Sequence, residues 1–224
     1  MGATTTAAEL GRAFPDVPVV DSSGNHVRER VDSTPRLIVA TPGAEPAPES
    51  GYACAVILDA VSSLSRPGLA AVEQTVDRWM AILALVRSVR DGGRAVIVGP
   101  SEDAALQAMV RNDPVGWATR ELADRREARF PPAVPCGIVD GDPKAVASAA
   151  QRLREWFGSV LELLGPAPQA RRASESERAR IIVRPRGTMP LAELSQGLFR
   201  LRSKHTMSRE PGSLRVVIDP ANLL

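Results

Sequence analysis

The chain has 224 residues and contains few cysteine, histidine, lysine and aromatic side chains. Its two cysteines (Cys54 and Cys136) and two histidines (His26 and His205) form no C-x-x-C pair or other clustered ligand set, so no zinc site is predicted. No apolar stretch reaches the roughly 18–20 residues of a membrane-spanning helix, and the N-terminus does not resemble a signal peptide. We therefore expect a cytoplasmic protein with no membrane segment, buried cysteines and surface histidines.

The sequence also lacks the glycine-rich motifs that hold nucleotides. A P-loop needs G-x-x-x-x-G-K-[ST], and neither of the two lysines, Lys144 and Lys204, follows such a loop. No G-x-G-x-x-G opens a helix after a predicted strand. Asp59 is the best isolated candidate for a catalytic carboxylate, because α/β sites collect where strands end, but it has no evident partner and a capping role is the simpler interpretation. We predict no catalytic, cofactor or metal site on this chain.

Charge is distributed unevenly along an otherwise ordinary globular composition of 44% hydrophobic and 24% charged residues. Residues 1–130 contain 14 arginines against 17 acidic residues, whereas residues 131–224 contain 14 basic residues against 9 acidic ones. The excess gathers in residues 171–215, which hold 11 basic and 4 acidic residues. Such a patch either neutralises phosphates or an acidic peptide, or it is simply a solvated face.

Strands and helices alternate over residues 1–130, which predicts an α/β unit with an open, mainly parallel sheet. Its continuous apolar runs are typical of strands that are buried on both faces. The predicted strands are 17–20, 37–40, 54–58 and 95–98, and the predicted longer helices are 68–87, 102–111 and 115–129.

A different order begins after the Phe130-Pro131-Pro132 segment, which we interpret as a domain boundary. Residues 131–224 predict β-α-β-β-α-β, the order of the ferredoxin-like α+β fold. The predicted elements are strand 134–139, helix 143–157, strand 160–164, strand 180–184, helix 191–204 and strand 214–219.

Several strings carry a family resemblance that covers nearly the whole chain. They are TTAAELGRAFPDVPVV near the N-terminus, DPVGWATRELADRREARFPPAV at the boundary, and then LGPAP, RARIIVRP and VVIDPANLL. In this order they resemble the PriA family of primosomal replication-restart helicases. The resemblance implies a RecA-like second helicase lobe over residues 1–130 and a PriA-type C-terminal domain over 131–224. The zinc cysteines and the P-loop lobe of the family would precede Met1, so we expect the C-terminal part of a longer protein, with ATP and zinc bound elsewhere.

The helicase motifs are degenerate in this chain. Active members carry a G-T-Q loop followed by Lys-Gly, where this chain reads ATPGAEP, with Thr41 kept and Pro42 in place of the glutamine. In the arginine-finger segment, Leu85 and Ser88 occupy the positions of the two arginines. An uncharged side chain cannot stabilise the charge that develops on a transferred phosphoryl group, a role worth roughly 10³ or more in rate. The resemblance therefore implies a lobe without its own catalysis.

Three hypotheses remain at the level of sequence. The first is a binding module in replication restart that recognises branched or single-stranded DNA, the tail of a single-strand-binding protein, or other primosome proteins. The second is the second lobe of an ATP-dependent DNA helicase, active only with its N-terminal half, with Arg87 or Arg90 as the finger. The third is a scaffold that merely keeps the family fold. For the first, the predicted DNA- or partner-binding residues are Arg171, Arg172, Arg184, Arg186, Arg200, Arg202 and Lys204.

Overall fold

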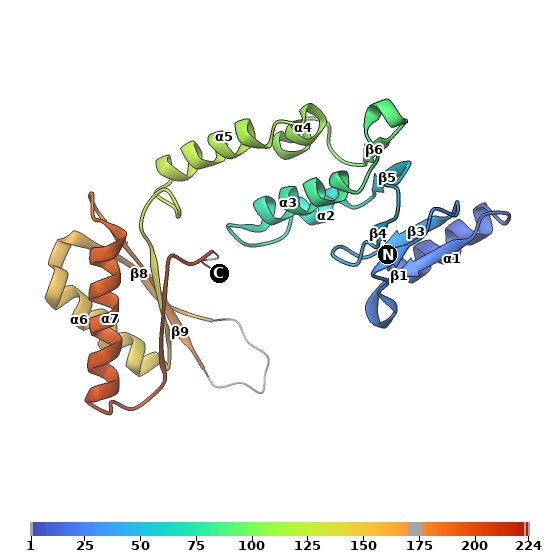
Figure 1. Ribbon diagram of the computed structural model, residues 1–224. Helices are drawn as coiled ribbons and strands as arrows, with labels where there is room; N and C mark the ends of the chain where they lie inside the picture. Colours follow the sequence, from blue (N-terminus) through green and yellow to red (C-terminus); the bar gives the residue numbers. More distant parts are fainter. Residues whose placement is uncertain (1, 170–176, 222, 224) are drawn as a thin grey trace. The chain divides into compact units, whose positions relative to one another are not determined.

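A computed structural model describes residues 2–169, 177–221 and 223 (Figure 1). The chain divides into two compact units, residues 1–114 and 115–224, which we call the first and the second unit. The division lies between Pro114 and Val115, at the start of the helix that the sequence analysis placed at the end of the first domain. Our boundary at residue 130 stays a prediction.

The first unit is a mixed α/β structure whose strands form three separate parallel pairs. β1 pairs with β3, β2 pairs with β4, and β5 pairs with β6. The helix α1 packs against β1 and β3, whereas α3 packs against α2, α4 and β5. Its elements are α1 (Ala3–Ala13), β1 (Val19–Ser22), β2 (Arg30–Val31), β3 (Leu37–Ala40), β4 (Ala47–Pro48), β5 (Cys54–Ile57), α2 (Ala60–Leu64), α3 (Ala71–Ala84), β6 (Arg94–Ile97) and α4 (Ala104–Arg111).

The strands of the first unit are less buried than their apolar sequences predict. Exposed and half-buried residues alternate along β5, and no residue of β6 is buried. Val56 and Val96, paired directly across these two strands, are 54% and 50% exposed. The prediction of strands buried on both faces is therefore wrong for this pair, because each strand has a single partner and little covers its face.

The second unit contains one antiparallel sheet of four strands in the order β10-β7-β9-β8. The chain reaches the strands in the order β-α-β-β-α-β, as the sequence predicts for residues 131–224. The helices α6 and α7 run beside each other on one face of this sheet (Figure 1). The elements of this unit are α5 (Pro114–Glu127), β7 (Gly137–Gly141), α6 (Pro143–Phe157), β8 (Leu161–Pro168), β9 (Ala179–Pro185), α7 (Leu191–Met207) and β10 (Leu214–Ile218).

The hydrophobic core of the second unit lies between the sheet and its two helices. Val139, Ile181 and Val183 from the two central strands are fully buried against leucines of α6 and α7. Gly197 allows α7 to lie close to α6, since a Cβ at this position would come within 2.5 Å of the Phe157 ring. The opposite face of the sheet is free of both helices and therefore available to polar side chains.

Two predictions about single residues are wrong. Cys54, expected in the core, is exposed in β5, whereas Cys136 is buried as expected. His205, expected at the surface, is only 8% exposed, because its ring nitrogens face Glu210 Oε2 at 3.3 Å and the Gly212 carbonyl at 3.0 Å. Within the described residues, no helix is both long and apolar enough to cross a membrane.

Candidate nucleic-acid interface

The predicted basic residues of α7 meet an aromatic side chain from α6. The Arg200 guanidinium lies 4.7 Å from the ring centre of Trp156, and the Lys204 ammonium lies 5.7 Å from it. Arg200 and Lys204 can share this ring because residues four apart occupy the same face of a helix. Trp156 is itself half-buried and packs against the core, so its ring is a firmly held contact for both cations.

The neighbouring face of α7 is exposed and carries both an aromatic and a basic side chain. Phe199 is 66% exposed, and Arg202, three residues further along the helix, is exposed as well. Neither Arg200, Arg202 nor Lys204 has an ion pair within the described residues. Cations in the last turns of a helix also interact favourably with its dipole. We call Trp156, Phe199, Arg200, Arg202 and Lys204 the α7 cluster.

Arg184, a second predicted contact, is engaged inside the protein. Its Nε donates to Glu162 Oε2 at 2.8 Å, and its Nη1 donates to the Arg129 carbonyl at 2.8 Å. The hydrogen bond from Arg184 lowers the pKa of Glu162 below its ordinary value, as does the charge of Arg129. This guanidinium therefore joins β8 and β9 to the segment that follows α5, and it has a structural partner for its charge.

The other predicted residues differ in their surroundings. Arg186 follows β9 and is exposed, with its backbone N–H donating to the Val160 carbonyl at 2.8 Å. Arg171 and Arg172 lie outside the described residues. The structure thus brings Arg200 and Lys204 together on one ring, and it places Arg184 and Arg186 elsewhere, at the C-terminal end of β9.

A charged row on the helix-free face of the sheet was not predicted from the sequence. Arg215 of β10 lies opposite Asp140 of β7, which lies opposite Arg180 of β9. Arg178 and Arg180 both donate to the Asp140 carboxylate, Arg180 at 3.3 Å. Burial opposes the ionised form of Asp140, but these two arginines outweigh it and lower its pKa. Only the strand register reveals this row, because its members are far apart in the sequence.

The positions that the resemblance aligns with helicase motifs have local structural roles in the first unit. Glu45 accepts a hydrogen bond from the Gly43 N–H at 2.8 Å, which closes the loop that replaces the G-T-Q motif. Ser88 caps a short 3-10 helix and accepts from the Asp91 N–H. Arg87 donates from its Nε to the Gly51 carbonyl at 3.0 Å. These contacts hold the backbone in place and leave Arg87 engaged.

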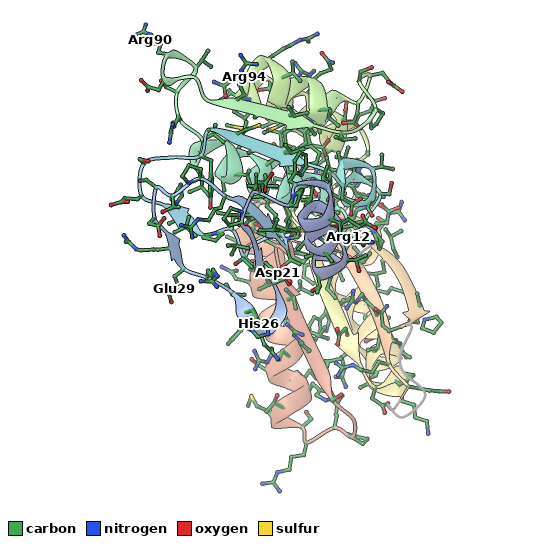
Figure 2. The ribbon with its side chains drawn as sticks, turned by 90° about the vertical axis from the view of Figure 1, so that its right-hand side faces the viewer. Arg12, Asp21, His26, Glu29, Arg90 and Arg94 are labelled. Carbon is green, nitrogen blue, oxygen red and sulfur yellow. The ribbon has the colours of Figure 1, made fainter. Side chains whose placement is uncertain are left out.

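Three further residues that the sequence singled out lie at the surface of the first unit. Arg90 points away from the ribbon at the tip of a loop, and His26 lies in the turn after β1 (Figure 2). Asp59 precedes α2 and is exposed. Among the residues that the structure describes, no group of three or more histidine, cysteine or acidic side chains could hold a metal ion.

Comparison with known proteins agrees with the resemblance. Residues 126–221, which include α6, α7 and the whole sheet of the second unit, match the family model described as the primosomal protein N C-terminal domain. The predicted resemblance to the C-terminal part of PriA is confirmed. The chain is 38% identical, over its whole length, to the probable replication restart protein PriA of Mycobacterium tuberculosis. It is likewise 38% identical to the protein of the same name from Mycobacterium leprae.

The match covers only part of the PriA proteins. The chain spans 36% of the length of the Mycobacterium tuberculosis protein and 35% of that from Mycobacterium leprae.

Proposed function

We propose that this chain is the C-terminal part of a PriA-like replication-restart protein and serves there as a non-catalytic module that binds branched or single-stranded DNA. The observation that carries the proposal is the α7 cluster, in which Arg200 and Lys204 flank the Trp156 ring. Exposed cations neutralise phosphates, and exposed aromatic rings stack on unpaired bases. Phe199 supplies an exposed ring beside the three cations, and so makes α7 a surface for single-stranded segments of a fork.

Within this proposal, the second unit is a ferredoxin-like domain and the first unit derives from the second RecA-like lobe of a helicase. The element order and the strand order of the second unit support the first assignment. The parallel pairing of β1 with β3 and of β5 with β6 supports the second assignment.

The binding proposal is tested by titrating a labelled fork DNA into the chain across a series of salt concentrations. The variant Arg200→Ala/Lys204→Ala should bind more weakly, and each lost phosphate contact should reduce the slope of log affinity against log salt by roughly 0.7–0.9. Arg90→Ala/Arg94→Ala is a matched control, because it removes two exposed cations from the first unit. Equal losses in both double variants would indicate general charge attraction in place of an α7 site.

An acidic peptide is a second candidate ligand, because it carries negative charge as DNA does. The tail of a single-strand-binding protein, or an acidic segment of another primosome protein, would meet the same exposed cations of α7. We propose that Arg186 contributes here, since it is exposed, whereas Arg184 is engaged with Glu162. Competition between the peptide and fork DNA in the same titration would show whether the two ligands share α7.

The alternative function is a lobe of an ATP-dependent helicase that works only with its N-terminal half. The exposed Arg90 favours this alternative, because an arginine finger must reach beyond its own lobe. We propose that the chain by itself neither binds nor hydrolyses ATP. DNA-dependent ATP turnover in a complex with the N-terminal half of a PriA protein, lost in Arg90→Ala, would favour the helicase alternative over the binding module.

A further inference from the structure

The helix-free face of the second unit's sheet carries a pocket away from the α7 cluster. The pocket has a volume of about 240 Å³ and is lined by the charged row Arg215, Asp140 and Arg180, with Ile138 and Val217 beside it. Pro220 and Ala221, which follow β10, complete the wall. Sites for drug-sized ligands usually hold roughly 300–1,000 Å³, so this pocket suits a small group on a larger molecule.

The pocket has an excess of positive charge. Arg178 and Arg180 each donate to one oxygen of the Asp140 carboxylate, so that both of its oxygens are occupied. Arg215 lies opposite the same aspartate in the strand register, is exposed, and has no ion pair within the described residues. Arg215, Arg180 and Asp140 give the pocket lining one excess positive charge. Arg178 does not line the pocket, but it adds a second positive charge beside the lining through its contact with Asp140.

Arg180 is held so that a hydrogen-bond donor remains unused. Its Nη1 donates to the Leu223 carbonyl at 3.1 Å and its Nη2 to Asp140 at 3.3 Å. Its Nε is buried and has no hydrogen-bond partner among the described residues. Buried donors without a partner are rare in native proteins, and a small shift of the Arg180 side chain toward the pocket would let a bound oxyanion satisfy this one.

We propose that this pocket binds a phosphate monoester, with Arg215 and Arg180 as its ligand-binding residues. A terminal phosphate carries close to two negative charges at neutral pH, which matches the local excess, whereas a carboxylate or an internal phosphodiester carries one. Among the residues that the structure describes, the lining contains only aliphatic and charged side chains and offers no aromatic ring on which a base could stack. The phosphate group comes either from free phosphate or from the 5′-phosphorylated end of a DNA strand.

If the phosphate belongs to the 5′ end of a DNA strand, this inference rests on the proposed DNA binding; if it is free phosphate, it does not. The experiment measures the affinity of the full chain for a single-stranded oligonucleotide with a 5′-phosphate and for the same oligonucleotide with a 5′-hydroxyl. We expect the phosphorylated strand to bind roughly tenfold more tightly or better, since charge-assisted hydrogen bonds to a guanidinium are strong. Arg215→Ala and Arg215→Glu should abolish the preference, and Arg94→Ala, which removes an exposed cation of the first unit, should keep it.

Further measurements distinguish a failure of the pocket proposal from a failure of the proposed DNA binding. If the chain binds no DNA but inorganic phosphate binds and is lost in Arg215→Ala, the pocket stands and the proposed DNA function fails. If the hydroxyl strand binds as tightly as the phosphorylated one, and inorganic phosphate does not compete, the pocket proposal is overturned while DNA binding stands. Displacement by a carboxylate-terminated peptide at lower concentration than by phosphate would also overturn it. Arg215 is exposed, so both variants should keep the circular dichroism spectrum of the parent chain.

Discussion

The two units of this chain use their strands in opposite ways. In the second unit, four strands form one sheet, and its central residues Val139, Ile181 and Val183 are completely buried under two helices. In the first unit, six strands form three pairs, and Val56 and Val96 remain half exposed. The difference teaches that apolar strand sequences alone do not build a core, since burial depends on how many neighbours each strand finds.

The largest difference between the units is expected when each is produced as a separate fragment. We expect residues 115–224 to unfold in one cooperative transition near that of the whole chain, because their sheet and core are complete. Residues 1–114 should bind the dye ANS and lack a sharp transition, because their strand pairs expose apolar faces. Circular dichroism and dye fluorescence measure both. A sharply unfolding first unit would remove the contrast.

A shorter fragment tests where the boundary between the two units lies. Residues 131–224 would lack the Arg129 carbonyl that accepts from Arg184, and Arg125, which donates to the Pro131 carbonyl at 3.1 Å, would be lost as well. We expect this fragment to be less stable than residues 115–224, since an unsatisfied buried partner costs about 1–3 kcal/mol. Equal stability would favour the boundary at residue 130.

The reactivity of the two cysteines tests the difference in burial between the units, because each unit contains one cysteine. Cys54 is exposed and should react with a thiol reagent at once. Cys136 is buried, and burial raises the pKa of its thiol to about 11, so little thiolate forms at neutral pH. We expect labelling rates that differ by orders of magnitude, measured by mass spectrometry. Similar rates in the native chain, with a single label at each, would contradict the burial of Cys136.

Matched core substitutions should also separate the units, with a smaller effect. Leu198 is fully buried in α7, and Leu198→Ala should reduce the free energy of unfolding by about 2–5 kcal/mol. Val96→Ala in β6 removes apolar atoms from a half-exposed position and should change it by about 0.5 kcal/mol or less. Urea denaturation measures both. A large loss from Val96→Ala would mean that β6 is covered in solution.

The smallest expected effect is in the acid sensitivity of the second unit. A hydrogen bond from Arg184 lowers the pKa of Glu162, and one from Arg152 lowers that of Glu210. Both pairs therefore stabilise the fold above the ordinary glutamate pKa of about 4.3, and this stability is lost as the pH falls through the lowered values. Glu162→Gln/Glu210→Gln should flatten the fall in stability below pH about 5. If the stability of the double variant fell below pH about 5 as steeply as that of the parent chain, the unfolded chain would have to keep these pairs.

Local signals predicted part of the fold accurately. The helix 143–157 has the predicted bounds because its ends are marked in the sequence. Asp142 accepts from the Lys144 N–H at 3.0 Å, Pro143 opens the first turn, and Gly158 ends the helix with a φ of +52°. The β-α-β-β-α-β order was predicted from similar capping, proline and glycine signals at the ends of the other elements. The two-residue strands β2 and β4 were missed, since so short a segment has no periodicity.

The candidate site was predicted less completely, because it depends on contacts between distant residues. The sequence identified Arg200 and Lys204 by charge, but it did not connect them with Trp156, more than forty residues earlier. Arg184 was chosen as a free cation, and its engagement with Glu162 follows only from the β8–β9 register. His205 was misplaced for a different reason: its partners Glu210 and Gly212 are close in sequence, but the turn after α7 that brings them back to the ring was not predicted.

The strand order of the second unit also has a consequence for how the protein is made. β7, the first strand of the sheet, lies between β9 and β10, and Gly137 pairs with Ile218 at the far end of the unit. During synthesis, β7 therefore leaves the ribosome long before its neighbour β10 has been translated. Until then, one edge of this central strand presents unpaired N–H and carbonyl groups. The nascent chain thus passes through an interval in which a chaperone, or another nascent chain, can occupy the place that β10 later takes.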